Sequence, residues 1–570
     1  MNKAKYLATL LITLISGTVN AFVTVGQGQE CDYNNLFTAY EDNDLEIRVT
    51  NEQVFTNNFI IEKFKIIKGG YDNCLAAQAG VVGNEKSKWS GLNALNNTVI
   101  EVDVNLAILA TVIIENFEIY DGKNESASGA GGIKVSGKSN VIIRDSIIYD
   151  NGGNEGGGLH VFGEDAILTL ENTVVRNNTA TGYGGGIYCS DGAHLNIDGN
   201  STIHDNEAAL NGGGLFGGND CDIVNNSGWL VDGRNRQGVS FNTANKGGGI
   251  YLQTGAQIEM SGTYYYPGII KRNYTDAANG LSGGGLYLTG EGTTAVLINS
   301  HIINNDSSGH GAGMVVTDHA TLYMSQAAEG CEYLEAEYCS QISNNWVQVV
   351  NYSGGAGYIS DYAEVNISQT EISHNKSILV NVFNLDEAAY LRLEGNLIRQ
   401  NDGLGQSPAY SLFHIGEAGS EPSQLDYLYN TVVANDVDRI FTANNISGRQ
   451  VLNVFNSIIW DNGTIFNFNG PATAQIDCTI VHESASLSGN VGAVLTNDPL
   501  FINAAIADYR PSLASDAIDF CDNSLFPAQF NDMNNNPRGF DMASVNNAFG
   551  TYDAGAYEYA PDIIFRSGFE

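Results

Sequence analysis

Four basic residues form the group in this sequence that is best suited to chemistry on an anionic substrate. Arg234 and Arg236 are two positions apart, so both side chains would point to the same side of an extended strand, and Lys271-Arg272 follows in the next long repeat. A lyase acting on polyuronates needs a cation to neutralise the substrate carboxylate and a base to remove the α proton. The alternative is that these loop residues only offset an acidic surface. We therefore treat the four as a candidate ligand patch and assign no catalytic residue.

A histidine between two glycines is a second candidate. Gly309-His310-Gly311 resembles the Gly-His-Gly motif of polygalacturonase-like hydrolases. His310, however, precedes its glycine cluster as Tyr183 precedes Gly184, and the Asn-Thr-Asp and Asp-Asp motifs of those hydrolases are not present in the expected order. No Ser/His/Asp order can be assigned either. We interpret His310 as a corner residue of a repeat.

Metal binding has weaker support. Oxygen-rich loops occur at 121–125, 150–155 and 217–223, but they lack the fixed spacing of an EF-hand. There is also no CxxC motif or Cys/His cluster. We therefore expect no cofactor, with structural calcium left as an open alternative.

The eight cysteines are even in number, which favours disulfides formed in an oxidising compartment. The sequence does not fix their connectivity. Pairing each cysteine with its nearest neighbour would join Cys31 with Cys74, Cys189 with Cys221, Cys331 with Cys339, and Cys478 with Cys521.

Two repeated patterns show which elements must carry these residues. Glycine clusters followed by an apolar pair begin at Gly156, Gly184, Gly212, Gly247, Gly283, Gly311 and Gly355, at intervals of 28, 28, 35, 36, 28 and 44 residues. A second pattern, of β-branched residues followed by asparagine, recurs at Asn151, Asn178, Asn206, Asn305, Asn345, Asn375, Asn401, Asn435 and Asn462. Glycine and asparagine both suit tight corners between short strands. Such strands can bury their apolar faces only by stacking coil on coil.

These patterns predict an all-β fold, a right-handed parallel β-helix with an amino-terminal cap and a small carboxy-terminal domain. The expected divisions are a signal peptide at 1–21, the cap at 22–97, the β-helix at 98–480, the carboxy-terminal region at 481–560 and a short tail at 561–570. About a dozen coils would form a rod of roughly 60 Å. Ile148, Val175, Ile187, Ile303, Ile372 and Ile459 are expected to occupy equivalent core positions. A β-propeller is disfavoured because each blade needs more residues than one of these repeats.

Composition and the amino-terminal segment limit the partners and the compartment. A net charge of −38 makes binding to nucleic acid or anionic lipid unfavourable. Lys3 and Lys5 precede an apolar stretch from Leu7 to Ile15, and Val19-Asn20-Ala21 follows as a small-residue cleavage signal, so we expect export and cleavage between Ala21 and Phe22. No later stretch has 18 uninterrupted apolar residues, and no membrane-spanning helix is therefore expected.

The two ends of the chain carry a family resemblance. The motifs are 46–49 and 64–72 near the start, then 498–501, 509–512, 517–519, Pro537-Arg538 and 553–558 near the end. Together they resemble secreted β-helix proteins with a choice-of-anchor Q type carboxy-terminal domain, and the repeats are similar to those of polymorphic outer-membrane proteins. Ser515-Asp516 departs from the Ser-Pro usual in such families, and 564–570 is similar to short tails on secreted Gram-negative proteins.

The resemblance implies an adhesin or glycan-contacting rod of the bacterial envelope and brings no catalytic motif. We therefore expect a protein secreted by, or attached to the surface of, a Gram-negative bacterium, which binds a glycan or a surface protein without catalysis. A polysaccharide lyase or glycoside hydrolase is one alternative. A passive structural envelope protein is the other.

Overall fold

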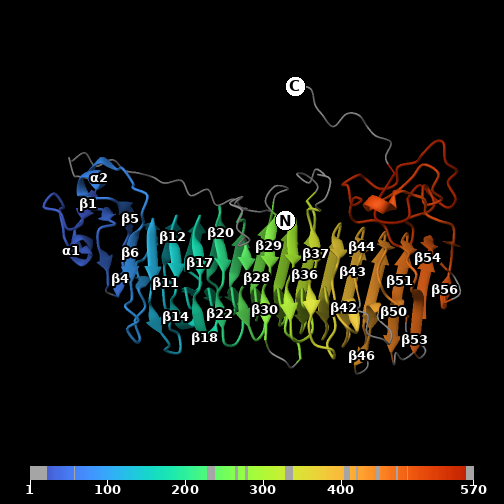
Figure 1. Cartoon of the computed structure of the whole chain (residues 1–570), viewed down its shortest axis with the longest axis horizontal. Coiled ribbons are helices and arrows are strands. Elements are labelled where there is room, and N and C mark those ends of the chain that lie inside the picture. Colours follow the sequence, from blue (N-terminus) through green and yellow to red (C-terminus); the bar gives the residue numbers. More distant parts are fainter. Residues whose placement is uncertain are drawn as a thin grey trace.

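The chain folds as a parallel β-helix (Figure 1). The computed structural model describes residues 22–56, 58–227, 238–262, 267–276, 280–327, 338–402, 411–418, 421–444, 450–469, 473–483 and 486–559. Four parallel sheets run along the rod, and we name them A, B, C and D, with 17, 16, 14 and 8 strands. At about 4.8 Å per coil, the strands of sheet A extend over roughly 75 Å.

One coil illustrates how the chain builds all four sheets. It passes from β12 (Ser139–Arg144) in sheet A to β13 (Ile147–Tyr149) in sheet B, β14 (Gly152–Glu155) in sheet D and β15 (Leu159–Phe162) in sheet C. The chain then returns to sheet A as β16 (Ile167–Glu171), which pairs in parallel with β12. Successive side chains of a strand point to opposite faces of its sheet, so alternate residues face the core. A shift of one residue in the pairing register would move the core side chains of that strand to the solvent face.

The core confirms four of the six predicted positions and corrects two. Ile148, Val175, Ile372 and Ile459 form one buried row on sheet B, whereas Ile187 is buried on sheet C and is therefore not equivalent to them. In β33 (Ser300–Ile303) the core residue is Ile302, which is fully buried, whereas Ile303 is half-buried and pairs with Lys271 on the outward row. The prediction for Ile303 was wrong because both residues of the pair are apolar, so the sequence does not show which one faces inward.

A ladder of buried side-chain amides joins the coils at the corner between sheets B and D. Each amide nitrogen donates to the side-chain oxygen of the next coil over 2.8 to 3.1 Å. The members are Asn151, Asn178, Asn206, Asn242, Asn273, Asn305, Asn345, Asn375, Asn401, Asn435 and Asp461. The sequence pattern missed Asn242 and Asn273, and the last member is Asp461 where Asn462 was expected. A ladder of this kind satisfies polar groups that burial would otherwise leave unpaired.

The glycine clusters form the tight turns through which the chain enters the strands of sheet C. Gly212 has a φ of +70°, and a side chain there would place its Cβ 2.6 Å from the Leu215 carbonyl oxygen. The equivalent residue in the last cluster is Gly354 and not Gly355, because Gly354 has a positive φ and its carbonyl accepts from Ala312, next to Gly311. Only glycine fits this backbone without strain.

Both ends of the rod differ from the expected divisions. Parallel pairing begins at β1 (Phe22–Val25), so the segment expected to be a cap already contributes strands, and α1 (Leu36–Glu41) covers this end with Leu36, Ala39 and Tyr40. At the other end, strands continue past 480 to β56 (Asn490–Val491) and β57 (Val494–Leu495). A second short helix is α2 (Cys74–Ala79).

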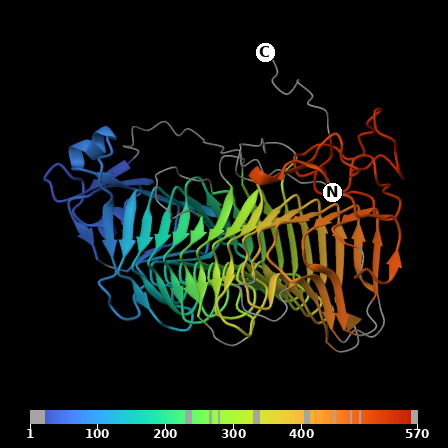
Figure 2. The same cartoon turned by 45° about the vertical axis from the view of Figure 1, so that its right-hand side comes forward.

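The carboxy-terminal module, residues 496–559, folds back over the last coils (Figures 1 and 2). It contains one antiparallel pair, β58 (Phe501–Asn503) with β59 (Asp508–Pro511), and a short 3-10 helix (Ala504–Ile506). Its Tyr509 and Tyr557 pack against Leu397 and Val433, which lie on sheet B. The Ala556 nitrogen donates to Thr431 Oγ1 at 2.9 Å.

The disulfide predictions divide into three outcomes. Cys31–Cys74 and Cys189–Cys221 are confirmed. Cys339 is disulfide-bonded, and its expected partner Cys331 lies outside the described residues. The fourth pair is a correction, because Cys478 and Cys521 are both buried free thiols. The Cys521 thiol instead donates to the Cys478 carbonyl at 3.0 Å.

Candidate functional site

An open groove follows the corner between sheets B and D over four successive coils. We name it the corner groove; its volume is about 480 Å³. The buried ladder residues Asn273, Asn305, Asn345 and Asn375 separate its two rows of lining side chains. One row is Arg272, Asn304, Asn344 and His374, and the other is Tyr274, Asp306, Trp346 and Lys376.

The local sequence explains why these side chains face outward. The residue before each ladder asparagine adopts a left-handed backbone, with φ near +55° at Arg272, Asn304, Asn344 and His374. The residue after it begins a short strand of sheet D, as in β34 (Asp306–Ser307) and β38 (Trp346–Val347). With the asparagine fixed inward by its neighbours, the two flanking residues are placed on the surface at every coil.

Trp346 offers the clearest binding surface in the groove. The residue is 40% exposed, although tryptophan, as a large aromatic residue, is usually more buried than this. It lies between Asp306 and Lys376 in the same row, one coil from each. A flat indole face beside hydrogen-bonding and charged groups suits a ligand that has both apolar and hydroxyl-bearing surfaces.

The charges of the groove differ from those of its surroundings. Among the described residues, the Arg272 guanidinium has no hydrogen bond or ion pair and lies 5.3 Å from the Phe241 ring. Lys376 has only a distant pairing, with its Nζ 4.0 Å from the Asp402 carboxylate. In the row of Tyr274 and Lys376, the neutral Thr243 precedes the groove, with Glu207 one coil earlier, and the acidic Asp402 and Asp436 follow it. The groove therefore carries two cationic side chains and one carboxylate, that of Asp306, and an acidic corner continues beyond it.

Two titratable side chains of the groove are shifted by burial. Burial raises the pKa of Asp306, against the opposing effect of a hydrogen bond from Gln348 Nε2 at 3.3 Å. Burial, followed by the charges of Arg399 and Lys376, lowers the pKa of His374. At neutral pH His374 is therefore neutral and can accept a hydrogen bond.

The predicted ligand patch is only partly brought together here. Arg272 lines the corner groove. Its neighbour Lys271 is buried at the end of β29 (Gly268–Lys271), where burial lowers its pKa. Arg234 and Arg236 lie outside the described residues. The sequence missed Trp346 and Lys376, although their position beside ladder asparagines was a usable signal.

His310 is built into the wall of its coil. Its Nδ1 accepts from the Ser353 nitrogen at 3.1 Å, and its ring lies 4.5 Å from that of Tyr358 and 4.8 Å from that of Tyr352. Burial lowers its pKa to about 4, so the ring is neutral. These contacts fit the interpretation of His310 as a corner residue.

A second groove of about 320 Å³ lies on the outer face of sheet C, and we name it the sheet groove. Asn384, His414, Thr442 and Asn467 form one outward row along four coils. His414 Nδ1 lies 3.0 Å from Thr442 Oγ1, and Asn467 accepts from Arg439 Nε at 2.8 Å once its amide is oriented to suit its neighbours. Earlier coils carry Tyr251 and Tyr287 in the same row, so its chemistry changes from aromatic to polar along the rod.

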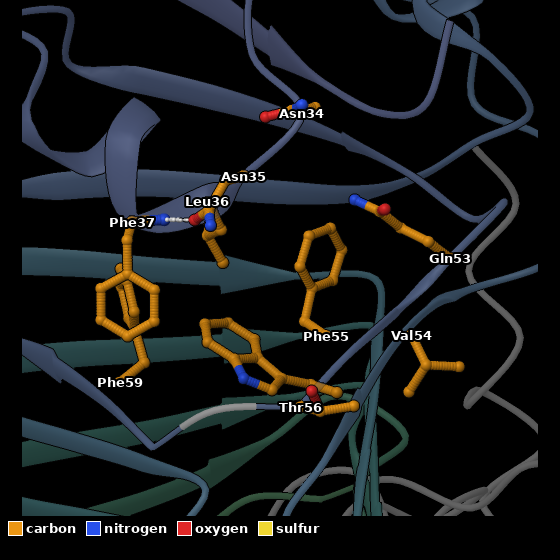
Figure 3. A pocket seen from close by; sticks show the side chains of 10 residues that line it. Asn34, Asn35, Leu36, Phe37, Gln53, Val54, Phe55, Thr56 and Phe59 are labelled. Carbon is orange, nitrogen blue, oxygen red and sulfur yellow. Dashed lines mark hydrogen bonds between the residues drawn. The ribbon is translucent and has the colours of Figure 1, made fainter.

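A smaller pocket of about 130 Å³ lies at the amino-terminal end (Figure 3). Phe37, Phe55 and Phe59 come from α1, β3 (Val54–Phe55) and β4 (Phe59–Ile61), and Trp89 of β6 (Ser87–Ser90) completes the aromatic lining. Asn35 is occupied as the helix cap, accepting from the Phe37 nitrogen at 2.8 Å. This pocket has room for one ring and none for a polymer.

Within the described ranges, no three His, Cys, Asp or Glu side chains gather in a way that could hold a metal ion. The oxygen-rich loops at 121–125 and 150–155 pair side by side, Lys123 with Gly152 and Asn124 with Gly153, and neither they nor the loop at 217–223 form such a group there. No helix in the described part of the chain has the length and hydropathy needed to cross a bilayer.

The motif residues of the carboxy-terminal module form a buried polar network. Arg538 donates to the Gly555 and Ala556 carbonyls at 3.1 Å, and its guanidinium lies 4.6 Å from the Tyr429 ring. The Glu558 carboxylate accepts from the Gly539 nitrogen at 2.6 Å. The hydrogen bonds lie within the module, and the contact of Arg538 with Tyr429 joins the module to the rod, so both residues have a structural role.

Comparison with known proteins does not extend these observations. No protein-family model, curated protein or solved structure matches the chain.

Proposed function

We propose that this protein is a secreted or cell-surface rod of a Gram-negative bacterium that binds a glycan through the corner groove, without catalysis. The observation that carries the proposal is the exposed Trp346 next to Lys376, in a groove that runs along the rod and that Arg272 also lines. Stacking on an aromatic ring, together with amide and charged hydrogen-bonding groups, is suited to sugar rings. The linear shape of the groove suits a polymer better than a single small molecule.

Two further observations support the compartment. The disulfides Cys31–Cys74 and Cys189–Cys221 belong to an oxidising environment. The leader-like segment and the resemblance to choice-of-anchor proteins favour the same placement, with attachment at the outer membrane as one form of it.

Binding is favoured over hydrolysis by the number of carboxylates. Glycoside hydrolysis generally uses two carboxyl groups across the scissile bond. Among the described residues that line the corner groove, Asp306 is the one carboxylate. A lyase would need only a cation and a base, and Arg272 with the neutral His374 keeps that alternative testable.

The binding test compares variants with matched controls on a panel of immobilised polysaccharides. We expect Trp346→Ala to weaken binding by tenfold or more, since it removes the stacking surface. Tyr323→Ala, which removes another exposed aromatic ring on β36 (Thr321–Ser325), should leave binding unchanged.

Lysines provide a second matched pair. Lys376 and Lys63 are both 41% exposed at the side chain, and each has its Nζ 4.0 Å from a carboxylate. Lys376→Ala should reduce binding and Lys63→Ala should not. Binding that is insensitive to Trp346 and Lys376, or no binding to any glycan, would contradict the proposal. Unsaturated products from polygalacturonate or alginate that disappear in Arg272→Ala would instead favour a lyase.

A further inference from the structure

We propose that one extended anionic polysaccharide occupies both grooves, running along the corner groove and then crossing residues 376–380 into the sheet groove. This inference rests on the glycan binding proposed above. It adds the class of glycan and the path that the polymer takes.

The two grooves meet at one short turn. Lys376 lines the corner groove, and Leu379 and Val380 line the sheet groove. Four residues span at most about 14 Å when extended, and here the Ser377 hydroxyl donates to the Val380 carbonyl at 2.6 Å, which closes the segment into a turn. Leu379 is 44% exposed on this turn, so it presents an apolar surface between the grooves.

The charge pattern explains why an anionic polymer would change faces at this turn. Beyond Lys376, the same corner row continues with Asp402 and Asp436. Their carboxylates would repel an anionic chain that stayed on the corner. The sheet groove on the neighbouring face instead offers Arg439, with His414 and Thr442 as hydrogen-bonding groups.

The partners of the arginines in the rod favour the proposal that the ligand is anionic. Six of those in the described ranges have a carboxylate within 4 Å: Arg48, Arg144, Arg392, Arg399, Arg510 and Arg538. In the same ranges Arg176, Arg272 and Arg439 have none. Arg176 lies 4.7 Å from the Tyr149 ring, and the other two each line one of the grooves. On a chain with a net charge of −38, guanidinium groups without a carboxylate partner in two adjoining grooves indicate a ligand that brings its own negative charge.

The separation of these arginines sets a minimum ligand length. Arg272 follows β29, and Arg439 begins β50 (Arg439–Asn444), five coils further along the rod. At about 4.8 Å per coil, the axial separation is roughly 24 Å. A shorter oligosaccharide can reach only one of the two.

The test measures affinity for graded oligosaccharides in three series, carboxylated (oligogalacturonides), sulfated and neutral, by calorimetry at low and high salt. For at least one anionic series, we expect affinity to rise with length until the oligomer exceeds roughly 24 Å, and to fall as salt is added. Arg439→Ala should weaken the long oligomers about tenfold and leave the short ones unchanged. Arg176→Ala is the matched control, and it should change neither.

The other outcomes separate this inference from the proposed function. If short and long oligomers bind equally and Arg439→Ala has no effect, the shared path is wrong and glycan binding in the corner groove still stands. If neutral oligomers bind as tightly as both anionic series, the assignment of an anionic ligand is wrong. If no oligomer of any series binds, both proposals fail.

Discussion

Asn305 donates from Nδ2 to the side-chain oxygen of Asn345, one coil further on, at 3.0 Å. The backbone nitrogen of Asn305 donates to the same oxygen at 3.0 Å, and its Nδ2 also donates to the Ile270 carbonyl at 3.1 Å. One buried side chain thus connects three coils. The same geometry places Asn304 and Asp306 in the corner groove, so stability and the candidate site depend on one ladder.

Removing one ladder amide should destabilise the rod. Asn305→Ala would leave the nitrogen and Nδ2 of Asn273 without their acceptor, and we expect a loss of about 3 kcal/mol in the free energy of unfolding. Denaturant unfolding would measure it. Asn196→Ala, at a half-buried position on the outer face of β20 (His194–Asp198), should cost less than about 1 kcal/mol. Equal losses in the two variants would contradict the importance of the ladder.

Adjacent isoleucines test the register of β33. Ile302→Asp would bury an unpaired charge among core side chains and should cost more than about 4 kcal/mol. Ile303→Asp should be tolerated, because this position faces outward beside Lys271. Circular dichroism and thermal unfolding of the two variants would distinguish them. The reverse order of stability would mean that the strand is shifted by one residue.

The carboxy-terminal module should loosen as pH rises. Burial, reinforced by the nearby Glu558 charge, raises the pKa of Asp553 to about 8, and burial also raises the pKa of Glu558 and of Asp532. The folded state therefore binds protons more tightly than the unfolded state, where an aspartate titrates near pH 4. The associated stability is present below about pH 4 and is lost as pH rises through about 8.

Limited proteolysis of 496–559 at pH 5 and at pH 9 would measure this effect. Cleavage should be faster at the higher pH, and Asp553→Asn should reduce the difference because it removes the titrating group. The control is Asp516→Asn, at an exposed position hydrogen-bonded to Asn497, which should keep the full difference. Greater stability at pH 9 would contradict the assigned direction.

Two thiols should be unreactive until the protein unfolds. Cys478 and Cys521 are buried, and burial with the neighbouring Cys478 raises the pKa of the Cys521 thiol well above its usual range. A buried, protonated thiol is a poor nucleophile. Mass spectrometry after alkylation should find both cysteines unmodified in the native protein and modified after denaturation without reductant. A Cys478–Cys521 disulfide, or alkylation in the native state, would contradict this assignment.

Local patterns in the sequence were sufficient for the class of fold. Glycine and asparagine recur at corner positions because each coil repeats the same backbone turns, so the spacing alone predicts stacked coils with a buried row such as Ile148 and Val175. The chemistry of the corner was also visible in principle, since Arg272 and Tyr274 flank a ladder asparagine. Arg272 was singled out but was not connected with Trp346 and Lys376, because Asn273, the ladder residue beside it, departs from the common pattern.

Tertiary structure decided what depends on neighbours in other coils. The pair Ile302-Ile303 is ambiguous by hydropathy, and only parallel pairing with β29 shows which one enters the core. The corner groove joins Arg272 to Lys376, which are 104 positions apart in the chain and three coils apart on the rod. Inserted loops make the repeats unequal, so sequence spacing alone cannot align such residues. Stacking brings them together because each coil, whatever its length, rises by the same strand separation of about 4.8 Å.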